Sequence, residues 1–392
     1  MNKIKILITI DCYLPTINGV IISVITLKKE LEERGHQVKV LTLSKTTNSY
    51  KVDDIVYLGS MGVGNFYPGA RFTFIRENNF IEELLLWKPD LIHSQSEFST
   101  FSISKEIARE LKIPIVHTYH TIYEDYTHYF SPVKKWGRLI AENITLKTLK
   151  YADLVIVPTK KISLLLLRYG VDKEINIIPT GINLKKFNKS TGLNSQDGLR
   201  KELKIPINHK VFIFVGRLGK EKNLEELILY LSRLERKDIT LLIVGDGPHR
   251  KTLENYSKGN AFLNNIIFTG MIDPNEIGAY YKLGDVFVSA STSETQGLTY
   301  IEALANSLPL ICREDQCLDD VIEEGINGFE YSTFEEFENS VNIVFSDNKI
   351  DLKKNALESV TKKFSSDLFA KRIEKSYQDT IKKYVGDHYK KK

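Results

Sequence analysis

The feature that most constrains the fold is an alternation between short β-branched runs and longer amphipathic stretches. The first half of the chain carries the runs "KIKILITI", "QVKVLTL", "DLIHS", "IPIVHTYH" and "DLVIVPT", and residues 18–34 show helical periodicity. Strands that alternate with helices in this way form parallel βαβ units. The sequence therefore predicts an α/β protein built on a parallel sheet.

A polar segment, 185–210, interrupts this pattern, which then restarts with "VFIFVG", "ITLLIVG", "IIFTG", "DVFVSA" and "LPLIC". A chain of 392 residues is also too long for one compact core. We therefore predict two doubly wound, Rossmann-like domains, 1–184 and 211–365, joined by a linker at 185–210. Residues 366–392 read as a closing helix. Two such domains facing a central cleft would direct the carboxyl ends of both sheets toward it, where open α/β sheets bind ligands.

Composition excludes several classes of protein. The net charge of +4, from 54 basic and 50 acidic residues, creates no overall field that demands nucleic acid as a partner. No apolar run approaches the roughly 18 residues that span a bilayer, and "KIKILITI" reads as a first strand and not as a signal peptide. Three cysteines give neither a disulfide framework nor a zinc motif. A protein of the reducing cytoplasm is expected.

The stretch "GRLGKEKN" places two cations in a strand-to-helix loop. Arg217 follows the strand and Lys222 precedes the next helix, which begins near Asn223. Arginine offers a planar fork of donors and lysine a mobile point charge, so a diphosphate is their natural partner. The alternative is that both are solvated surface charges, as most lysines and arginines are.

The stretch "SETQGLTYIEALA", residues 293–305, predicts a second anion site at a helix start. Gly297 allows close approach of backbone to a ligand, and the free N–H groups of the following helix favour an anion. Glu294 lies ahead of this helix and Glu302 in its second turn. Carboxylates beside a phosphate site indicate a ligand with hydroxyls as well as charge, such as a nucleotide sugar. The alternative for Glu302 is an exposed helix residue.

Two stretches in the first domain add candidate contacts. Asn18 and Gly19, in "PTINGV", could face the ligand, although a helix N-cap by Asn18 explains the pattern almost as well. The stretch "HTYHTIYEDYTHY", residues 117–129, is too polar for a core and too aromatic for an ordinary loop, which indicates a binding surface. His120, Asp125 and His128 fit no recognised metal motif, so hydrogen bonding to substrate is preferred.

Together these motifs resemble the retaining GT-B glycosyltransferases of family 4. The resemblance rests on "GRLGKEKN", "VGDGP", "IPTGIN" and the Glu294 to Glu302 spacing, and it covers essentially the whole chain. It implies a nucleotide diphosphate sugar as donor, with the following residues around it: Arg217 and Lys222 on the diphosphate, Glu302 on the ribose, Glu294 on the sugar hydroxyls, Gly19 facing the phosphate, Gln296, Gly297 and Leu298 lining the donor site, and His120 beside the anomeric carbon. It also implies that the closing helix crosses back to the first domain.

Within that family, "NGVIISV", "HTYHTIYEDYTHY" and "SETQGLTYIEALA" are most similar to bacterial 1,2-diacylglycerol 3-glucosyltransferases, which make glycolipids and lipoteichoic acid anchors. The resemblance implies transfer of glucose from UDP-glucose to a lipid acceptor without a metal cofactor. The acceptor would contact Tyr123, Asp125, Tyr126 and His128. A single Gly19 stands where many relatives have a glycine pair. The alternatives are a soluble transferase with a capsular, wall or protein acceptor, and a nucleotide-sugar 2-epimerase.

Residues 132–150, "PVKKWGRLIAENITLKTLK", predict a membrane contact. Five basic residues stand against one acid, and on a helical projection Val133, Trp136, Ile140 and Ile144 share one face. Basic residues lie on the other side, so the expected contacts are Lys134, Lys135, Trp136 and Arg138. The enzyme would then attach peripherally to the inner face of an anionic cell membrane. The alternative is a surface helix whose apolar face packs on the first domain's sheet.

Overall fold

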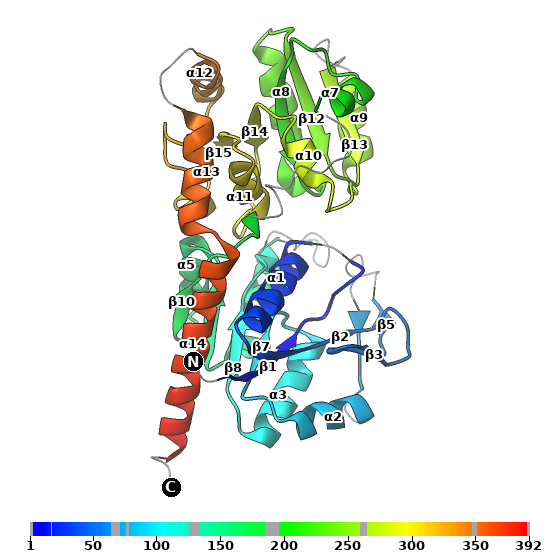
Figure 1. Ribbon diagram of the computed structural model, residues 1–392, viewed down its shortest axis with the longest axis vertical. Coiled ribbons are helices and arrows are strands. Elements are labelled where there is room, and N and C mark those ends of the chain that lie inside the picture. The colour runs from blue at the N-terminus through cyan, green and yellow to red at the C-terminus, as the bar shows by residue number, and fades with distance from the viewer. Residues whose placement is uncertain are drawn as a thin grey trace. The chain divides into compact units, whose positions relative to one another are not determined.

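The structure is a computed structural model that describes residues 3–16, 18–63, 71–75, 78–124, 134–184, 196–258, 265–346 and 351–389 (Figure 1). It divides into two compact units. Unit 1 comprises Met1–Gly181 and Ser366–Lys392, and unit 2 comprises Ile182–Ser365. Each unit is a sheet covered by helices, and each is described by itself.

Unit 1 is built on an eight-stranded sheet in the order β10-β9-β8-β7-β1-β2-β4-β3, in which only β3 runs antiparallel to its neighbour. Its strands are β1 (Lys5–Thr9), β2 (Gln37–Leu43), β3 (Tyr50–Val52), β4 (Ile55–Leu58), β7 (Leu91–Ser94), β8 (Ile115–Thr118), β9 (Leu154–Val157) and β10 (Ile175–Ile177), with β5 (Met61–Gly62) and β6 (Arg71–Phe72) as a separate pair. Its helices are α1 (Gly19–Glu33), α2 (Asn79–Trp87), α3 (Ser99–Leu111), α4 (Lys134–Leu149), α5 (Lys160–Arg168) and α14 (Ser366–Tyr389).

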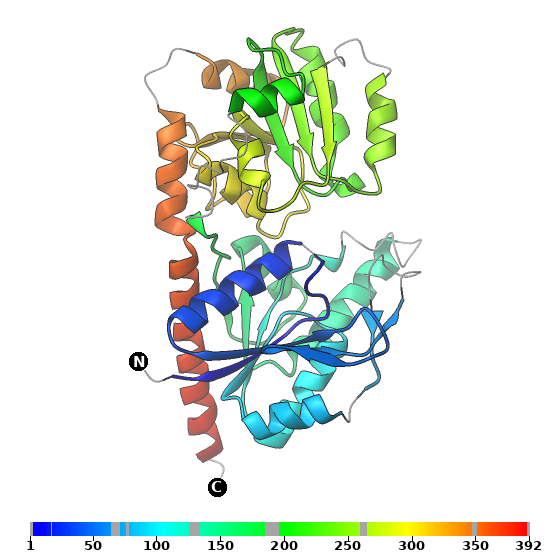
Figure 2. The same cartoon turned by 45° about the vertical axis from the view of Figure 1, so that its right-hand side comes forward.

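Helices cover both faces of the unit 1 sheet, which is why its central strands are almost wholly buried. One face packs against α1 and α14 through residues such as Leu27 and Ile373, both essentially inaccessible to solvent. The other face packs against α2 and α3 through residues such as Leu84 and Phe101. Figure 2 shows α1 lying across this sheet and the long α14 running beside it. The C-terminal helix is therefore part of the core of unit 1.

Unit 2 is built on a six-stranded, wholly parallel sheet in the order β13-β12-β11-β14-β15-β16. Its strands are β11 (Lys210–Val215), β12 (Ile239–Val244), β13 (Ile266–Gly270), β14 (Val286–Ser289), β15 (Leu310–Arg313) and β16 (Gly328–Tyr331). Its helices are α7 (Gln196–Glu202), α8 (Leu224–Arg233), α9 (Arg250–Lys258), α10 (Ile277–Tyr281), α11 (Leu298–Ala305), α12 (Phe334–Val344) and α13 (Leu352–Lys363), with short 3-10 turns η2 (Lys220–Lys222) and η4 (Gln316–Leu318).

Successive residues of the unit 2 strands point to opposite faces, and each face has its own helices. Phe212 and Phe214 pack with α8 and α12, whereas Val211 and Ile213 pack with α11 and α13. The order of strands reverses between β11 and β14, so the carboxyl ends of these two strands form the switch point at which such sheets bind ligands.

The predicted fold class is confirmed, because each unit is a parallel or mainly parallel α/β sheet covered by helices on two faces. All ten strand runs named from the sequence are strands. The segment predicted as a linker contains α7, whose Leu199 packs against the unit 2 core together with the buried Ile205. The segment 185–210 is mostly polar, so its few apolar residues did not predict a helix packed on unit 2. The chain passes between the units at Gly181–Ile182 and Ser365–Ser366.

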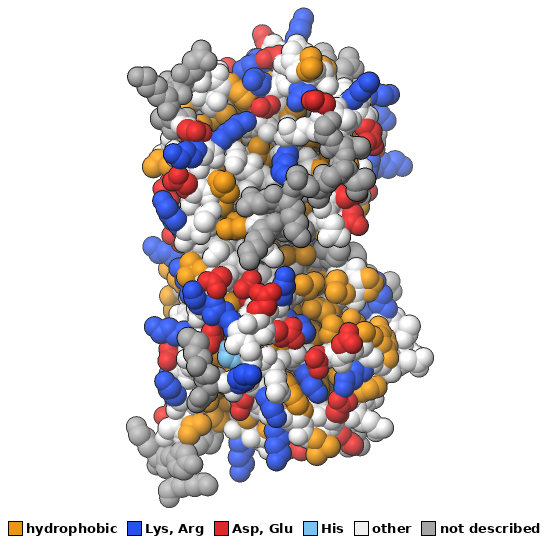
Figure 3. Space-filling model, in the orientation of Figure 1, with side chains coloured by type: hydrophobic (Ala, Val, Ile, Leu, Met, Phe, Trp, Pro, Cys, Tyr) orange, Lys and Arg blue, Asp and Glu red, His pale blue; other side chains and the backbone are white. Residues whose placement is uncertain are grey.

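Hydrophobic side chains gather on unit 1 over the part that carries β5 in Figure 1, as Figure 3 shows. Met61 pairs with Phe72 across the β5–β6 ladder, and the ring of Phe72 lies 4.7 Å from that of Phe74. Met61 is 54% exposed and Phe74 is 73% exposed. These residues form an apolar surface on unit 1 that the sequence analysis did not single out.

Candidate active site

Two charged loops meet at the carboxyl ends of β11 and β14. Arg217 follows β11 and is exposed, whereas Lys222 ends the turn η2. Glu294 lies in the loop between β14 and α11, and its Oε1 forms an ion pair with Nζ of Lys222. The side chains of Lys222 and Glu294 are 14% and 20% exposed. Parallel strands place both loops at one edge of the sheet, which brings a cation and an anion 72 residues apart into contact.

A hydrogen bond between the two loops and a sharp turn of the chain position the ion pair of Lys222 and Glu294. The hydroxyl of Ser293 donates to the carbonyl of Glu221 at 3.4 Å, which joins the two loops beside the ion pair. Asn223 adopts the left-handed conformation at φ 50°, ends η2 and begins α8. Asparagine tolerates this conformation better than most residues. The chain therefore turns sharply directly after Lys222.

The amino end of α11 lies beside Glu294. Gly297 precedes the helix with φ 71°, and a Cβ atom there would lie 2.3 Å from the ring of Tyr300. Both facts require glycine at this position. Gln296 is 4% exposed, and Leu298 is the first helical residue. The N–H groups of the first turn and the helix dipole favour a negative group at this point.

A buried tyrosine of unit 2 binds the carboxylate of Glu302. Its Oε2 accepts a hydrogen bond of 2.9 Å from the hydroxyl of Tyr281, which is completely buried on α10. Burial, with the negative charge of Glu302, raises the pKa of Tyr281 well above its usual value. The phenol therefore remains a donor, and Glu302 is a positioned carboxylate and not an exposed helix residue.

In unit 1, the candidates surround the carboxyl ends of β1, β7 and β8. Asn18 caps α1, since its side chain accepts from the N–H of Ile21 at 2.9 Å, and Gly19 is the first helical residue. His120 follows β8, and its Nε2 lies 2.7 Å from Oε1 of Gln95. Burial and the neighbouring His117 lower the pKa of His120 to about 3, so the ring is neutral at physiological pH.

A group of acidic and aromatic side chains lies beside His117, the histidine that neighbours His120. The hydroxyl of Tyr123 donates to Glu97 Oε2, and Nε2 of His117 lies 3.4 Å from Glu97 Oε1. Asp11 accepts from the N–H of Thr100 at 2.8 Å. Burial raises the pKa of Asp11 to about 6, and the nearby charge of Glu97 adds to this effect.

Gln95, Glu97 and Asp11 were not predicted from the sequence. A usable signal was present, because "HSQSE" continues directly from β7 and Asp11 follows β1, both at carboxyl ends of strands. A buried carboxyl group with a raised pKa, such as that of Asp11, is typical of functional sites. Asp125, Tyr126 and His128 lie outside the described residues, so their expected acceptor contacts remain predictions.

Helix α4 turns an apolar surface outward. Gly137, Ala141 and Thr145 are buried, whereas Trp136 is 66% exposed, Leu139 52% and Ile140 43%. Lys135 is also exposed, and Arg138 forms a 3.5 Å ion pair with Glu124. The side chain of Lys134 and all of Val133 lie outside the described part. The face of α4 that is buried in unit 1 consists of small residues, threonines and Leu149. Trp136 and Ile140, which were expected on the apolar face, are exposed and do not pack on the sheet.

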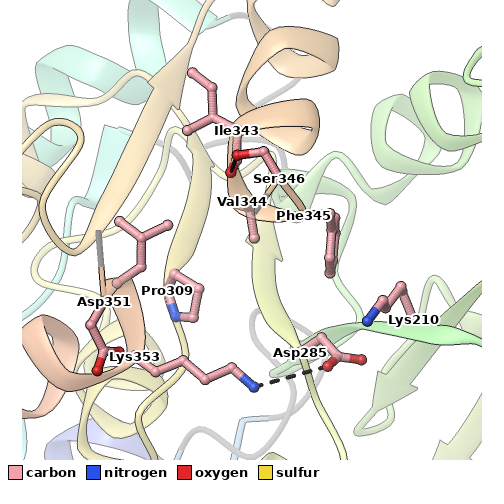
Figure 4. A pocket seen from close by; sticks show the side chains of 10 residues that line it. Lys210, Asp285, Pro309, Ile343, Val344, Phe345, Ser346, Asp351 and Lys353 are labelled. Atoms are coloured by element: carbon pink, nitrogen blue, oxygen red, sulfur yellow. Dashed lines mark hydrogen bonds and ion pairs between the residues drawn. The ribbon is translucent and has the colours of Figure 1, made fainter. Parts of the chain in front are cut away.

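A cavity of about 280 Å³ in unit 2 lies at the opposite edge of the sheet (Figure 4). Lys210 begins β11, and Asp285 and Pro309 directly precede β14 and β15, so the cavity adjoins the amino ends of these strands. Figure 4 shows Lys353 reaching toward Asp285, at 3.9 Å. The charged loops described above follow the carboxyl ends, so this cavity is separate from the candidate site.

Among the described residues, no three histidine, cysteine or acidic side chains are grouped as metal ligands. In the same part of the chain, no helix combines the length and the hydropathy that a membrane span requires.

Comparison with known proteins identifies the family. The profile of the family "Glycosyltransferase Family 4" matches residues 17–186, and that of "Glycosyl transferases group 1" matches residues 195–364. The chain is 35% identical over 388 residues to an alpha-monoglucosyldiacylglycerol synthase of Acholeplasma laidlawii, covering 95% of this chain and 96% of that protein. It is 35% identical over 375 residues to a protein of the same name from Streptococcus pneumoniae, covering 95% and 85%.

Solved structures agree on the fold. Anabaena HepE, in complex with UDP and glucose, superposes with a TM-score of 0.75 at 18% identity, over 96% of this chain and 100% of that one. Sucrose-phosphate synthase from Thermosynechococcus elongatus gives 0.73 at 21% identity, over 96% and 99%. With two family profiles that together span most of the chain and relatives aligned over nearly its full length, the chain belongs to glycosyltransferase family 4 and is a hexosyltransferase with the GT-B fold.

Proposed function

We propose that this enzyme transfers glucose from UDP-glucose to 1,2-diacylglycerol at a membrane surface, with retention of the anomeric configuration. The observation that carries this proposal is the alignment, at 35% identity over 95% of the chain, with two alpha-monoglucosyldiacylglycerol synthases. A third relative, the sulfoquinovosyl transferase SQD2 of Arabidopsis thaliana, is 30% identical over 317 residues, covering 76% of this chain and 58% of that protein.

The geometry of unit 2 suits a diphosphate with attached sugars. Arg217, Lys222 and the amino end of α11 supply positive charge where the departing UDP develops negative charge. Glu302 is fixed by Tyr281 and is assigned to the ribose, and Glu294 to hydroxyls of the transferred sugar. Because the protein supplies this charge, the proposed reaction needs no metal ion.

The chemistry then follows from the stabilisation of the leaving group. As the bond between the anomeric carbon and the diphosphate breaks, the acceptor hydroxyl attacks from the same face of the sugar, its proton passes to the departing diphosphate oxygen, and the configuration is retained. Fixed cations and amide dipoles accelerate such a step without reorganising. In unit 1, His120 is assigned to the reacting sugar and Gly19 to the phosphate, with Tyr123, Asp125, Tyr126 and His128 assigned to the acceptor.

The outer surface of α4 supports the proposed membrane attachment. Trp136, Leu139 and Ile140 would enter the interface, while Lys134, Lys135 and Arg138 would approach anionic headgroups. Each basic residue near such a surface contributes about 1 kcal/mol, which salt weakens. The acceptor would then reach the enzyme without leaving the bilayer, on the cytoplasmic side.

The acceptor assignment is tested by incubating the purified enzyme with labelled UDP-glucose and vesicles that contain diacylglycerol. Parallel reactions replace the donor with UDP-galactose, GDP-mannose or ADP-glucose, and the acceptor with wall, capsular or protein preparations. We expect labelled lipid from UDP-glucose and diacylglycerol. Label in one of the other acceptors alone would replace the proposal with the soluble-acceptor alternative. An epimer formed from UDP-sugar without acceptor would indicate an epimerase.

The membrane assignment is tested by sedimentation with phosphatidylglycerol vesicles. We expect wild type to sediment at low salt and a Lys135→Glu, Trp136→Ala, Arg138→Glu variant to remain in solution. The matched control is Lys201→Glu, Ile207→Ser, Lys251→Glu, which changes exposed basic and apolar residues of unit 2 and should still sediment. Equal sedimentation of wild type and the α4 variant would remove α4 from the proposal and direct attention to the apolar surface around Met61 and Phe74.

A further inference from the structure

Gln95 and His120 contact each other across neighbouring strands of unit 1. Gln95 directly follows β7 and His120 lies two residues after β8, which pairs with β7 in parallel. The side-chain oxygen of Gln95 lies 2.7 Å from Nε2 of His120. Gln95 is only 4% exposed, and its backbone N–H donates to the carbonyl of Thr9 on β1 at 2.8 Å. The glutamine is therefore fixed from two sides.

This contact selects one form of the histidine. An amide oxygen only accepts, so Nε2 of His120 must carry the hydrogen. In a neutral ring the other nitrogen, Nδ1, then has a lone pair and can accept a hydrogen bond. The amide nitrogen of Gln95 has no hydrogen-bond partner among the described residues. A buried amide nitrogen without a hydrogen-bond partner is unfavourable. The contact that offsets this cost at Gln95 is the one between its oxygen and His120.

The surroundings keep the ring neutral. Two other histidines, His93 on β7 and His117 on β8, interact electrostatically with this ring. Glu97 contacts His117, and Tyr123 and Asp11 lie close to Glu97 in turn. His93 is itself held, since Nδ1 lies 2.6 Å from the hydroxyl of Tyr377 and Nε2 lies 2.7 Å from the hydroxyl of Thr118. Gln95 is the uncharged group in direct contact with His120, and a neutral partner does not favour protonation of the ring.

We propose that Gln95 is a positioning residue, which fixes the ring of His120 in its Nε2–H form so that Nδ1 accepts a hydrogen bond from a substrate hydroxyl. This rests on the proposed function, in which His120 lies beside the reacting sugar. Gln95 acts through His120 and is not assigned a contact with substrate.

Two substitutions of Gln95 separate its role as a hydrogen-bond acceptor from the effect of its neutral charge. Gln95→Met keeps the length of the side chain but removes the acceptor. Gln95→Glu keeps an acceptor in the same place and adds a negative charge. The matched control is Gln378→Met, the same change at a half-buried glutamine of α14 in the same unit.

We expect Gln95→Met to lower kcat roughly fivefold to tenfold, as loss of one hydrogen bond would, with KM for UDP-glucose within about twofold. Gln378→Met should leave kcat unchanged. At pH 8, Gln95→Glu should recover most of the activity lost in Gln95→Met, because its carboxylate accepts the same hydrogen bond. Between pH 8 and 5 it should lose activity that wild type retains, since the carboxylate favours the imidazolium, whose Nδ1 no longer accepts.

Nitrogen-15 NMR of labelled histidine tests the tautomer independently of transfer. Assignment by comparison with His120→Ala should show Nε2 protonated and no titration above about pH 5 in wild type, and titration in Gln95→Glu. Protonation at Nδ1 in wild type, or full kcat in Gln95→Met, overturns the role of Gln95 even if glucosyl transfer is confirmed. If transfer to diacylglycerol fails while the expected tautomer is seen, the proposed function fails and the positioning of His120 stands.

Discussion

At the scale of single residues, the pair formed by Lys222 and Glu294 is the main addition to what the sequence indicated. The motifs predicted each residue as a separate ligand group, whereas the structure joins them by an ion pair. The two side chains carry opposite charges, so neither charge lies unpaired in this partly buried position. An incoming diphosphate would compete with Glu294 for Lys222 and turn the carboxylate toward sugar hydroxyls.

Removal of Lys222 should therefore weaken use of the donor. We expect Lys222→Ala to lower kcat/KM for UDP-glucose by roughly 10-fold to 100-fold, because a hydrogen bond to a charged group contributes about 1.5 to 3 kcal/mol. Arg217→Ala should act in the same direction. The control is Lys220→Ala, which removes an exposed lysine two residues away. Steady-state kinetics measure the effect, and near-normal values for both Lys222 and Arg217 variants would refute the diphosphate assignment.

Glu294→Gln tests the carboxylate with little change of shape. If Glu294 binds sugar hydroxyls, turnover should fall by roughly 10-fold to 100-fold. The affinity for UDP alone should be maintained or rise, since UDP carries no transferred sugar and Lys222 loses a competing partner. Calorimetry with UDP and turnover with UDP-glucose separate the two. An unchanged rate would return Glu294 to the role of a structural partner of Lys222.

The ionised carboxylate of Asp11 should reduce the free energy of unfolding at neutral pH. Its pKa is about 6 in the folded state against 3.8 as the reference, so the folded protein binds this proton more tightly and loses stability as pH rises from about 4 to 6. Asp11→Asn keeps an acceptor for Thr100 and should increase the free energy of unfolding at pH 8 by on the order of 3 kcal/mol. The gain should fade toward pH 4.

Thermal unfolding at both pH values measures this effect. Asp153→Asn is the control, since Asp153 also accepts from a backbone N–H, that of Ile115 at 2.8 Å. A constant gain at both pH values would show that the charge of Asp11 is not its cause. A stabilised variant with reduced turnover would assign Asp11 to the functional site.

At the scale of elements, the sequence predicted those that hydrophobic periodicity specifies. Buried parallel strands such as "ITLLIV" and the amphipathic α1 were recognised because their patterns are continuous. The strands β5 and β6 were missed because two residues carry no period, and β16 was missed because its sequence, "GFEY", is not a continuous apolar run. Helix α7 was missed because its surroundings are polar.

Helix α14 illustrates a contact that no local pattern reveals. The hydroxyl of Tyr377 lies 2.6 Å from Nδ1 of His93 on β7, 284 residues away, and both side chains are buried. We expect Tyr377→Phe to reduce the free energy of unfolding by about 1 to 3 kcal/mol, because it leaves a buried ring nitrogen unpaired.

Denaturant unfolding of Tyr377→Phe measures this loss, with Tyr151→Phe as the control at a tyrosine that is 53% exposed in the same unit. Equal stability of the two variants would mean that α14 is held by its apolar residues alone. In that case Ile373→Ala, at a fully buried position, should show the larger loss.

At the scale of the whole molecule, the family could be inferred from the sequence because several motifs lie at strand ends in a consistent order. The partners of those motifs could not, since Lys222 with Glu294 and His120 with Gln95 depend on strand order in three dimensions. The GT-B architecture is common to enzymes with different acceptors, so fold alone does not select diacylglycerol.

The proposed reaction joins glucose to diacylglycerol. The most direct measurement is mass spectrometry and proton NMR of the lipid extracted after incubating the full chain with UDP-glucose and diacylglycerol vesicles, with Glu294→Gln as the matched control. We predict a monohexosyl diacylglycerol in which the sugar is α-glucose, with much less in the variant. Diacylglycerol recovered unchanged while the enzyme glycosylates another acceptor, or a β-linked product, would contradict the account.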